Sequence, residues 1–317
     1  MSNWPSQVSG PKPRIVALGE VLWDVLPEGP RLGGAPANLC AMAGRLGNDA
    51  ILASRIGADE LGNRMLDTLS PLPVDTSFLQ KDAVLPTGTV TVKVTPEGQP
   101  SYCIHEGVAW DALQMTQAWK YLAAEADAVC FGSLAQRSAL YRSTIQDFIS
   151  NTREDCLRVF EINLRPPFLS REVVRWSVEH ASMLKLNDEE LTTVFDLLGL
   201  PLPSAKDRHR ASLEVLMTAF PLYMICLTLG SEGSLIVGRN GHYRHAGVPT
   251  AVIDTVGAGD AFLATVIHCV LHGASLAETS EAANRYASWI ASQAAAIPET
   301  WPPPLFHALD DSSESAR

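Results

Sequence analysis

The sequence is short of basic residues and has no long apolar run. Its 317 residues contain 24 Lys and Arg against 35 Asp and Glu, which gives a formal net charge of −11. No segment forms the basic stripe that neutralises nucleic-acid phosphates or anionic lipid headgroups. The apolar stretch 261–271 stops well short of the roughly 18–20 residues that span a bilayer, and residues 1–14 lack the apolar core of a secretory signal. We therefore expect a cytoplasmic protein with neither nucleic acid nor a membrane as partner.

Signals for disulfides and metal sites are also missing. The six cysteines are scattered and include no C-x-x-C pair, so neither a disulfide framework nor a zinc site is expected. The pair His268 and His272 has no third ligand nearby, and the pair His242 and His245 lies in an expected turn or strand. We do not interpret either pair as a metal site. Because 46% of the residues are apolar, the chain can bury the core of one large or two modest domains.

Apolar, β-rich runs alternate with helical patterns along the chain. The strand candidates are 14–21, 50–57, 127–133, 157–164, 181–187 and 223–230. The helix candidates are 36–47, 58–69, 115–126, 170–181, 188–199, 212–220, 259–273 and 277–296. This order favours an α/β protein in which helices cover both faces of a mostly parallel sheet.

The segment 88–107 departs from that pattern. Val90, Val92 and Val94 alternate with polar residues, and a Pro-Glu-Gly turn leads to a second strand. The alternation predicts an amphipathic antiparallel hairpin. Such a hairpin suits a flap over a cleft or a subunit contact, and it equally suits a surface hairpin packed on its own domain.

The segment 251–271 carries the strongest chemical signal. A β-rich stretch runs into Gly257-Ala258-Gly259-Asp260, and an apolar helix follows at once. Small residues let a ligand approach the backbone, and the free N–H groups of a helix N-terminus attract anions. Asp260 has two interpretations, a helix-capping carboxylate or a general base beside the anion site.

A second glycine-rich element lies at 31–47. Gly33 and Gly34 precede a helix that has Pro36 near its first turn, followed by Asn38. An Asn amide can both donate to and accept from the hydroxyls of a polyol. The element is equally compatible with a plain loop-to-helix turn.

Seven segments, in order along the chain, carry a shared set of motifs. They are GEVLWDVLPEG (19–29), RLGGAPANLCAMAGRLG (31–47), RIGADELGNRMLDTL (55–69), EINLR (161–165), KLNDEEL (185–191), LTLGSEGS (227–234) and DTVGAGDAF (254–262). Together they resemble the PfkB, or ribokinase-like, family of carbohydrate and nucleoside kinases, and are most similar to bacterial fructokinases. The resemblance covers about residues 14–300. It implies a ribokinase-like three-layer α/β/α sandwich with a mostly parallel sheet and a small β-hairpin lid.

The resemblance also implies how the chain is divided. One kinase domain would occupy residues 14–306, with lid elements at about 20–32 and 88–110, and residues 1–13 and 307–317 would be loose termini. Closure of the lid over the sugar would exclude water and suppress hydrolysis of ATP. The apolar face of an open lid makes a homodimer plausible.

The same resemblance gives the glycine-rich helix start its chemistry. Asp260 would accept the proton of a primary sugar hydroxyl as that hydroxyl attacks the γ-phosphorus of ATP. The N–H groups of Gly257, Ala258 and Gly259 would stabilise the transferring phosphoryl group. A helix N-terminus lowers the pKa of a nearby carboxyl, so we expect Asp260 to be ionised at neutral pH.

The remaining site residues follow from the same matches. The sugar would contact Asp24, Gly33, Gly34, Asn38, Arg165 and, on the second strand of the hairpin, Tyr102, although the alternation leaves His105, Glu106 and Trp110 open as well. The nucleotide would contact Asn187, Thr228, Gly230, Ser231, Gly233 and Asn284. Mg²⁺ would be held through water by Asn187 and Glu190, which also fit a helix cap, and a monovalent cation such as K⁺ by Asp254 and Val256.

Three departures from the family pattern concern the site. Glu161 stands where the D-x-N-x-R element has Asp, Thr265 replaces a small Gly in the helix after the base, and Leu22-Trp23 replaces an Asn-x pair before Asp24. The best-matching reaction is phosphorylation of D-fructose to fructose 6-phosphate. The alternatives are 2-keto-3-deoxygluconate, ribose or adenosine kinase, and a non-catalytic sugar or nucleotide sensor.

Overall fold

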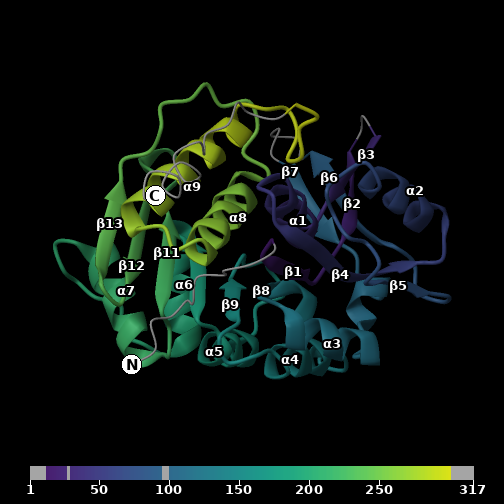
Figure 1. Ribbon diagram of the computed structural model, residues 1–317, viewed down its shortest axis with the longest axis horizontal. Coiled ribbons are helices and arrows are strands. Elements are labelled where there is room, and N and C mark those ends of the chain that lie inside the picture. Colours follow the sequence, from purple (N-terminus) through teal and green to yellow (C-terminus); the bar gives the residue numbers. More distant parts are fainter. Residues whose placement is uncertain (1–11, 27–28, 95–99, 301–317) are drawn as a thin grey trace, which may run out of the picture.

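A computed structural model describes residues 12–26, 29–94 and 100–300, with the backbone alone at 92–94 and 100–102. The predicted β-rich runs and helical patterns become a large sheet between two layers of helices (Figure 1). The strands are β1 (Arg14–Leu18), β2 (Leu22–Leu26), β3 (Gly29–Gly33), β4 (Asp49–Gly57), β5 (Leu79–Asp82), β6 (Gly88–Val94), β7 (Pro100–Ile104), β8 (Ala128–Gly132), β9 (Leu157–Glu161), β10 (Met183–Asn187), β11 (Met224–Thr228), β12 (Ser234–Gly238) and β13 (Gly241–His245). The helices are α1 (Ala35–Arg45), α2 (Glu60–Leu69), α3 (Gln117–Glu125), α4 (Arg142–Ser150), α5 (Arg171–His180), α6 (Asp188–Leu198), α7 (Arg208–Ala219), α8 (Ala258–Leu271) and α9 (Leu276–Ala291), with 3₁₀ turns η1 (Ala109–Ala112), η2 (Leu134–Gln136) and η3 (Gly230–Glu232).

The large sheet has the strand order β13-β12-β11-β10-β9-β8-β1-β4-β5. All pairs from β11 to β5 are parallel, and β12 and β13 join at one edge as antiparallel strands. Parallel strands buried on both faces need apolar residues throughout, which is why their sequences form continuous apolar runs. The predicted mostly parallel sheet is confirmed.

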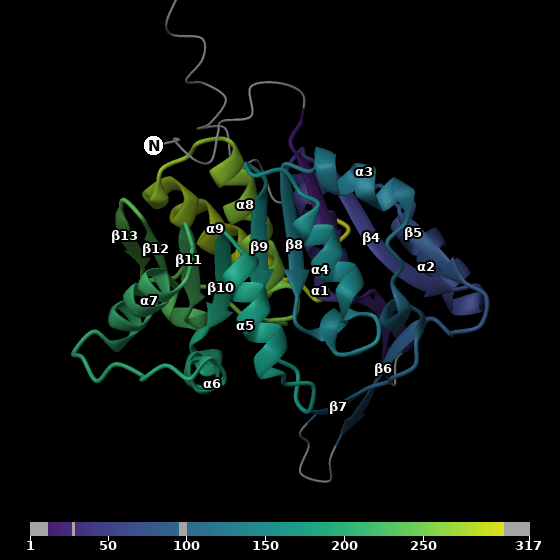
Figure 2. The same ribbon diagram turned by 90° about the horizontal axis from the view of Figure 1, so that it is seen from below.

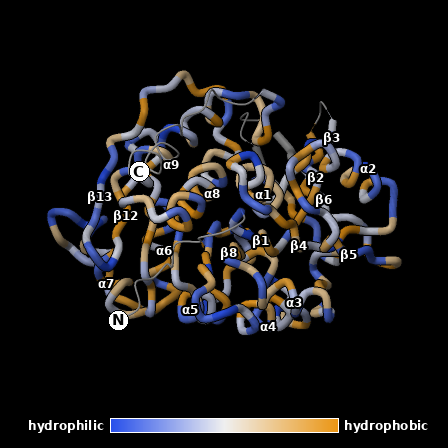
Figure 3. Tube along the Cα trace, in the orientation of Figure 1, coloured by the Kyte–Doolittle hydropathy of each residue, from blue (hydrophilic) through white to orange (hydrophobic). Residues whose placement is uncertain are grey.

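Successive residues of each central strand face different helix layers. In β1, Ile15 and Ala17 pack in the core beneath α1, α8 and α9, whereas Val16 and Leu18 pack in the core beneath α3, α4 and α5. Figure 2 shows α3 to α7 on the near side of the sheet and α1, α8 and α9 behind it. The hydropathy colouring in Figure 3 places apolar residues along the central strands. This alternation is what a two-sided strand requires.

A second, smaller sheet stands beside α1 and α2, with the order β3-β2-β6-β7 (Figure 1). The hairpin predicted at 88–107 forms its β6–β7 half, in which Val90 pairs with Ile104. Its predicted turn lies in 95–99, outside the described residues. The sequence did not predict that β2 would pair in parallel with β6, which places Asp24 opposite Val90.

The structure differs from the sequence analysis in the β-rich stretch before Gly257 and in one helix boundary. Residues 251–256 form no strand; Val252, Ile253 and Val256 are exposed, and Ile253 N donates to Ala291 O at 2.9 Å. The last helix ends at Ala291 rather than at residue 296, because Ser292 N turns back to the carbonyls of the final turn. Within the described residues, no helix is both long enough and apolar enough to cross a membrane.

Candidate active site

The predicted site residues gather at the carboxyl ends of adjacent parallel strands. Glu161 ends β9, Asn187 ends β10 and Thr228 ends β11. The register pairs Lys185 with Glu161 and Asn187 with Thr228, so these side chains share one edge of the sheet. Open α/β sheets bind ligands at this edge.

Helix α8 points its N-terminus at the same region. Gly257 precedes the helix with φ +83°, and a Cβ there would lie 2.6 Å from the Ala296 Cβ. Only glycine therefore fits. Among the described residues, the Gly259 and Asp260 amides have no hydrogen-bond acceptor, whereas Ala258 N donates to Thr255 O. The free amides and the helix dipole make an anion site.

Asp260, in the first turn of α8, is buried with 8% of its surface exposed. Asn38 Nδ2, on α1, donates to Asp260 Oδ2 at 2.8 Å. The carboxylate is thus turned toward the other glycine-rich element, and among the described residues it does not cap its own helix. The capping interpretation is not supported, and Asp260 is positioned to meet a ligand.

The pKa expected for Asp260 was wrong in direction. Burial raises the pKa of its carboxyl to about 7, and repulsion from Glu161 adds to the rise. The Asn38 hydrogen bond and the charges of Lys185 and Arg165 oppose it. The helix dipole alone would favour the anion, but removal of water from a buried carboxylate outweighs it here.

A buried ion pair lies directly beneath the start of α8. Lys185 Nζ donates to Glu161 Oε1 at 2.7 Å, and both side chains are shielded from solvent. A Cβ on Gly259 would lie 3.1 Å from Lys185 Nζ, so the lysine reaches the anion site. Burial lowers the pKa of Lys185, but the Glu161 charge and hydrogen bond more than offset it and raise that pKa above its ordinary value. The lysine is therefore a cation.

Asp24 and the di-glycine turn Gly33-Gly34 form the second part of the candidate site, apart from the start of α8. A Cβ on Gly33 would overlap Asp24 Oδ2, and a Cβ on Gly34 would lie 2.7 Å from Glu20 O. Gly34 has φ +102° and is the N-cap residue of α1. The two glycines thus admit the Asp24 carboxylate and the sharp turn. Trp23 points elsewhere, since its Nε1 donates to Leu61 O at 3.0 Å.

Arg165 supplies the second positive charge near these carboxylates. It is exposed, and its charge lowers the pKa values of Asp24, Glu20 and Asp260 against the opposing effect of their burial. Its guanidinium donates to Leu164 O at 3.1 Å. One buried cation, Lys185, and one exposed cation, Arg165, thus act on the carboxyl groups of the site.

The residues that the sequence suggests for sugar contact, on and just after the hairpin, lie in different environments. Trp110 is buried beneath the Arg137 guanidinium, 4.0 Å from the ring centre, and so does not face an open site. His105 Nε2 lies 2.8 Å from Thr91 Oγ1, and Glu106 is exposed. Tyr102 lies on β7 opposite Val92, and its side chain is outside the described part of the chain.

Asn187 and Glu190 form a capping box at the start of α6. Asn187 N donates to Glu190 Oε2 and Glu190 N donates to Asn187 Oδ1, both at 2.9 Å. Leu164 N donates to Glu190 Oε1 at 2.7 Å. No group of three or more His, Cys, Asp or Glu able to hold a metal occurs in the described ranges. The oxygen donors present suit a hydrated Mg²⁺ that substrate phosphates also hold, rather than a cage of carboxylates.

The loop after β11 is fixed by glycines. Gly230 and Gly233 have φ +57° and +84°, and a Cβ on Gly233 would overlap the backbone of His245 and Gly247. Ser231 lies between them in η3. The two glycines therefore fix the course of the loop at the end of β11, where Ser231 is exposed.

Two further predicted residues have partners inside the protein. Asn284 Nδ2 donates to Ser234 Oγ at 2.8 Å and to Ser280 O at 2.7 Å, which joins α9 to β12. Asp254 Oδ1 accepts from Val256 N at 3.0 Å. The other carboxylate oxygen of Asp254 and the Val256 carbonyl remain oxygen donors of the kind a monovalent cation takes.

The family departures have structural reasons. Glu161, longer than Asp, reaches Lys185. Thr265 is fully buried, and its Oγ1 donates to Ala261 O at 2.8 Å, so its hydroxyl is satisfied within α8. Of the histidines set aside as metal ligands, His268 Nδ1 lies 3.1 Å from Asn48 Oδ1.

Sequence reasoning missed two buried charged residues, Lys185 and Glu20. Lys185 is a cation within the otherwise apolar strand β10, and Glu20 is an acid directly after the buried strand β1. Charged residues are seldom buried without a partner or a role. Their positions inside apolar runs were the available signal.

Comparisons with known proteins agree with this architecture. Residues 29–302 match the family described as pfkB family carbohydrate kinase. A fructokinase of Escherichia coli is 26% identical over 271 residues, 80% of this chain and 83% of the relative. The crystal structure of an uncharacterized sugar kinase from Pyrococcus horikoshii in complex with ATP has a TM-score of 0.76 at 25% identity, covering 89% of this chain and 94% of that one.

A fructokinase from Vibrio cholerae O395, in its fructose, ADP and calcium ion bound form, shares the fold with a TM-score of 0.75 at 24% identity, over 90% of this chain and 95% of that one. The fold class and the family resemblance expected from the sequence are thereby confirmed. The chain belongs to the pfkB family of carbohydrate kinases, phosphotransferases that act on a sugar hydroxyl.

Proposed function

We propose that the protein transfers the γ-phosphoryl group of ATP to a primary hydroxyl of a small sugar, with D-fructose as the acceptor and fructose 6-phosphate as the product. The observation that carries this proposal is the placement of Asp260. Its buried carboxylate lies at the N-terminal end of α8, beside free backbone amides, and is held by Asn38 from the second glycine-rich element. A base and an anion site thus stand side by side.

Asp260 acts as the general base. As the sugar oxygen bonds to the γ-phosphorus and the bond to the β-phosphate bridging oxygen breaks, the hydroxyl proton passes to the Asp260 carboxylate and ADP leaves. A pKa of about 7 makes Asp260 a stronger base than an exposed aspartate, although it is only partly ionised at neutral pH. Asn38 fixes the carboxylate through its 2.8 Å hydrogen bond.

The phosphoryl group lies over the start of α8. The amides of Gly257 and Gly259 stabilise the charge that develops on it, and Lys185 supplies a cation directly behind them. The Ala258 amide is assigned to the same role, although it donates to Thr255 O in this structure. Asn187 and Glu190 would hold Mg²⁺ through its water ligands, and the bound ion would neutralise charge on the phosphates. Asp254 and the Val256 carbonyl would hold a monovalent cation beside the same helix start.

The nucleotide lies along the ends of β10 and β11. The backbone of the Gly230–Gly233 loop, with Thr228 and Ser231, borders it, and the glycine conformations there support a close approach. Asn284 is assigned to the same site, although its amide is engaged with Ser234 and Ser280.

The sugar lies between Asp24 and Asp260. Asp24 and Gly33 belong to the second sheet, so that sheet forms the lid, and Gly34, Asn38, Arg165 and Tyr102 complete the acceptor site. Val25 of β2 is exposed, which supports homodimerisation through the lid. Because the reaction consumes ATP, we place the protein in the cytoplasm.

The acceptor is tested with a panel in a coupled ADP-release assay. D-fructose, 2-keto-3-deoxygluconate, ribose and adenosine are compared by kcat/KM. We expect the highest value for fructose, and a rate confined to adenosine would refute that assignment. If the protein binds a sugar tightly but turns over no acceptor, it is a sensor rather than an enzyme.

The base is tested with Asp260→Asn. We expect ATP binding, measured by calorimetry, to remain near that of the wild type, and kcat to fall by several orders of magnitude. A loss of less than about tenfold would be too small for a positioned general base. Asp67→Asn, on the distant helix α2, serves as the matched control and should leave kcat unchanged.

A further inference from the structure

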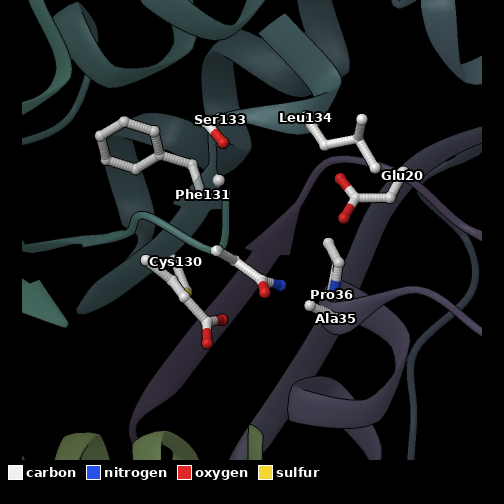
Figure 4. A pocket seen from close by; sticks show the side chains of 10 residues that line it. Glu20, Ala35, Pro36, Cys130, Phe131, Ser133 and Leu134 are labelled. Carbon is white, nitrogen blue, oxygen red and sulfur yellow. The ribbon is translucent and has the colours of Figure 1, made fainter. Parts of the chain in front are cut away.

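Glu20 is a buried acid that the mechanism does not yet use. It lies between β1 and β2, has 5% of its surface exposed, and its Oε2 has no hydrogen-bond partner among the described residues. Figure 4 shows its carboxyl group pointing into a small pocket, with Leu134 and Pro36 on either side and Ser133 across from it. A buried carboxylate oxygen without a donor costs free energy, so a native site that retains one calls for a function.

The pocket has room for one small polar group. Its volume is about 10 Å³, close to the space that one water molecule needs. Ser133 Oγ donates its proton to Ile162 O at 2.7 Å, so only its lone pairs remain for the pocket. Glu161 also borders it. The rest of the wall is mostly apolar, apart from the Asn163 amide, which can donate as well as accept. The unpaired Glu20 oxygen can therefore take a hydrogen-bond donor of the size of an O–H group.

The pocket lies where the acceptor sugar is proposed to bind. Ala35 and Pro36, in the first turn of α1, form part of its wall, and the Glu20 carbonyl abuts Gly34. Four residues further on, the same chain segment carries Asp24. Burial raises the pKa of Glu20 to about 7, and the charges of Arg165 and Asp260 also act on it. Glu20 therefore adjoins the di-glycine turn proposed to contact the sugar.

We propose that Glu20 determines acceptor specificity by accepting, through its free carboxylate oxygen, a hydrogen bond from an O–H group in this pocket. The inference rests on the proposed sugar-kinase function. The O–H group belongs either to a hydroxyl of the sugar or to a bound water that bridges Glu20 to the sugar. Either source would make the protein favour polyhydroxylated acceptors that can supply or reach this donor.

The test compares Glu20→Gln with the wild type for the best acceptor and its monodeoxy analogues. Gln keeps the size of Glu but removes the charged acceptor. At pH 8, where a carboxyl group with a pKa of about 7 is ionised, the variant loses a hydrogen bond to a charged group. We therefore expect KM and the calorimetric Kd for the parent sugar to rise about 10- to 100-fold, with kcat within about threefold. Glu179→Gln, on the surface of α5, controls for the loss of one carboxylate.

The analogues distinguish the two donors. If a sugar hydroxyl donates, one deoxy analogue binds the wild type and Glu20→Gln equally, while the others retain the difference. If a bound water donates, all analogues show the same difference. A folded Glu20→Gln protein whose sugar Kd stays within about twofold of the wild type overturns the proposal. Glu20→Asp, which retains the charge but withdraws it from the pocket, should weaken binding similarly and decides the matter if Glu20→Gln does not fold.

Calorimetry without ATP separates this proposal from the proposed function. If the sugar binds but is never phosphorylated, the proposed kinase function is refuted. The role of Glu20 in sugar binding is then still tested by the Kd values of its variants. Loss of binding in Glu20→Gln together with normal binding in Asp260→Asn is the expected pattern. The reverse pattern would place the acceptor contact at Asp260 and refute the role of Glu20.

Discussion

Replacing Lys185 with methionine should leave the Glu161 carboxylate buried without its cation. The two groups are 2.7 Å apart, and both are shielded from solvent. Methionine is about as long as lysine and fits an apolar strand, so the change removes the charge with little loss of volume. The cost then comes from the unpaired carboxylate.

The size of the effect follows from that geometry. Breaking a buried ion pair by removing one partner costs about 3–5 kcal/mol. For a chain of this length each kcal/mol lowers Tm by about 2 °C, so we expect a decrease of about 6–10 °C. Asp260 also loses a charge that lowers its pKa. The acid limb of the kcat profile should therefore move to higher pH.

Thermal unfolding at pH 7.5 and kcat as a function of pH measure the two effects. The double variant Lys185→Met with Glu161→Gln removes both charges and should regain most of the lost Tm, because replacing a whole buried pair by neutral groups is often nearly neutral. If Lys185→Met melts within about 2 °C of the wild type, or the double variant melts no higher than the single one, the pair does not hold this edge of the sheet together.

Two further predictions concern the helix start and its base. Gly257→Ala forces a φ of +83° on a residue with a Cβ, 2.6 Å from Ala296 Cβ; we expect a loss of about 1–3 kcal/mol in urea unfolding and weaker ATP binding by calorimetry. The folded pKa of Asp260 is about 7 against 3.8 for the free side chain. The folded state thus binds the Asp260 proton more tightly than the unfolded state does. The stabilisation that this proton contributes is fully present below about pH 4 and is lost as pH rises through 7. Asp260→Asn should therefore melt higher than the wild type at pH 8, and by less at pH 5.

Opposite results would contradict both predictions. Gly273→Ala, at another left-handed glycine with φ +75° but remote from the helix start, controls for backbone strain in the first experiment. Equal ATP affinities for Gly257→Ala and Gly273→Ala would show that the start of α8 does not bind the phosphates of ATP. In the pH experiment, the contrary result is the same rise in Tm between pH 5 and pH 8 for the wild type and Asp260→Asn. That result would mean that burial does not raise the pKa of Asp260.

The large sheet was predictable because its central strands are buried on both faces. Their sequences are continuous apolar runs, separated by helical patterns. The outermost strand β13 (Gly241–His245) was not predicted, because it is almost wholly exposed and its sequence forms no apolar run. Helix α4 (Arg142–Ser150) was also missed, although Ile145, Phe148 and Ile149 have helical spacing and are buried.

The site was less predictable than the fold, because its electrostatics depend on residues far apart in sequence. Lys185 and Glu161 meet only because β9 and β10 pair in this register. The pKa of Asp260 was misjudged because the helix dipole can be inferred from a motif, while burial and the nearness of Glu161 cannot. Trp23 occupies a family position beside Asp24 yet turns to Leu61, which no spacing rule would indicate.

The low basicity of the chain constrains how it can bind ATP. Around the proposed phosphoryl position the acids Asp24, Glu20, Glu161, Glu190 and Asp260 outnumber the cations Lys185 and Arg165. Side-chain charge there would repel a free nucleotide tetra-anion. Attraction must then come from the backbone amides at the start of α8 and from the divalent ion carried with the phosphates. ATP without Mg²⁺ should consequently bind much more weakly than the Mg²⁺ complex, and neutralising Glu161 or Glu190 should narrow that difference.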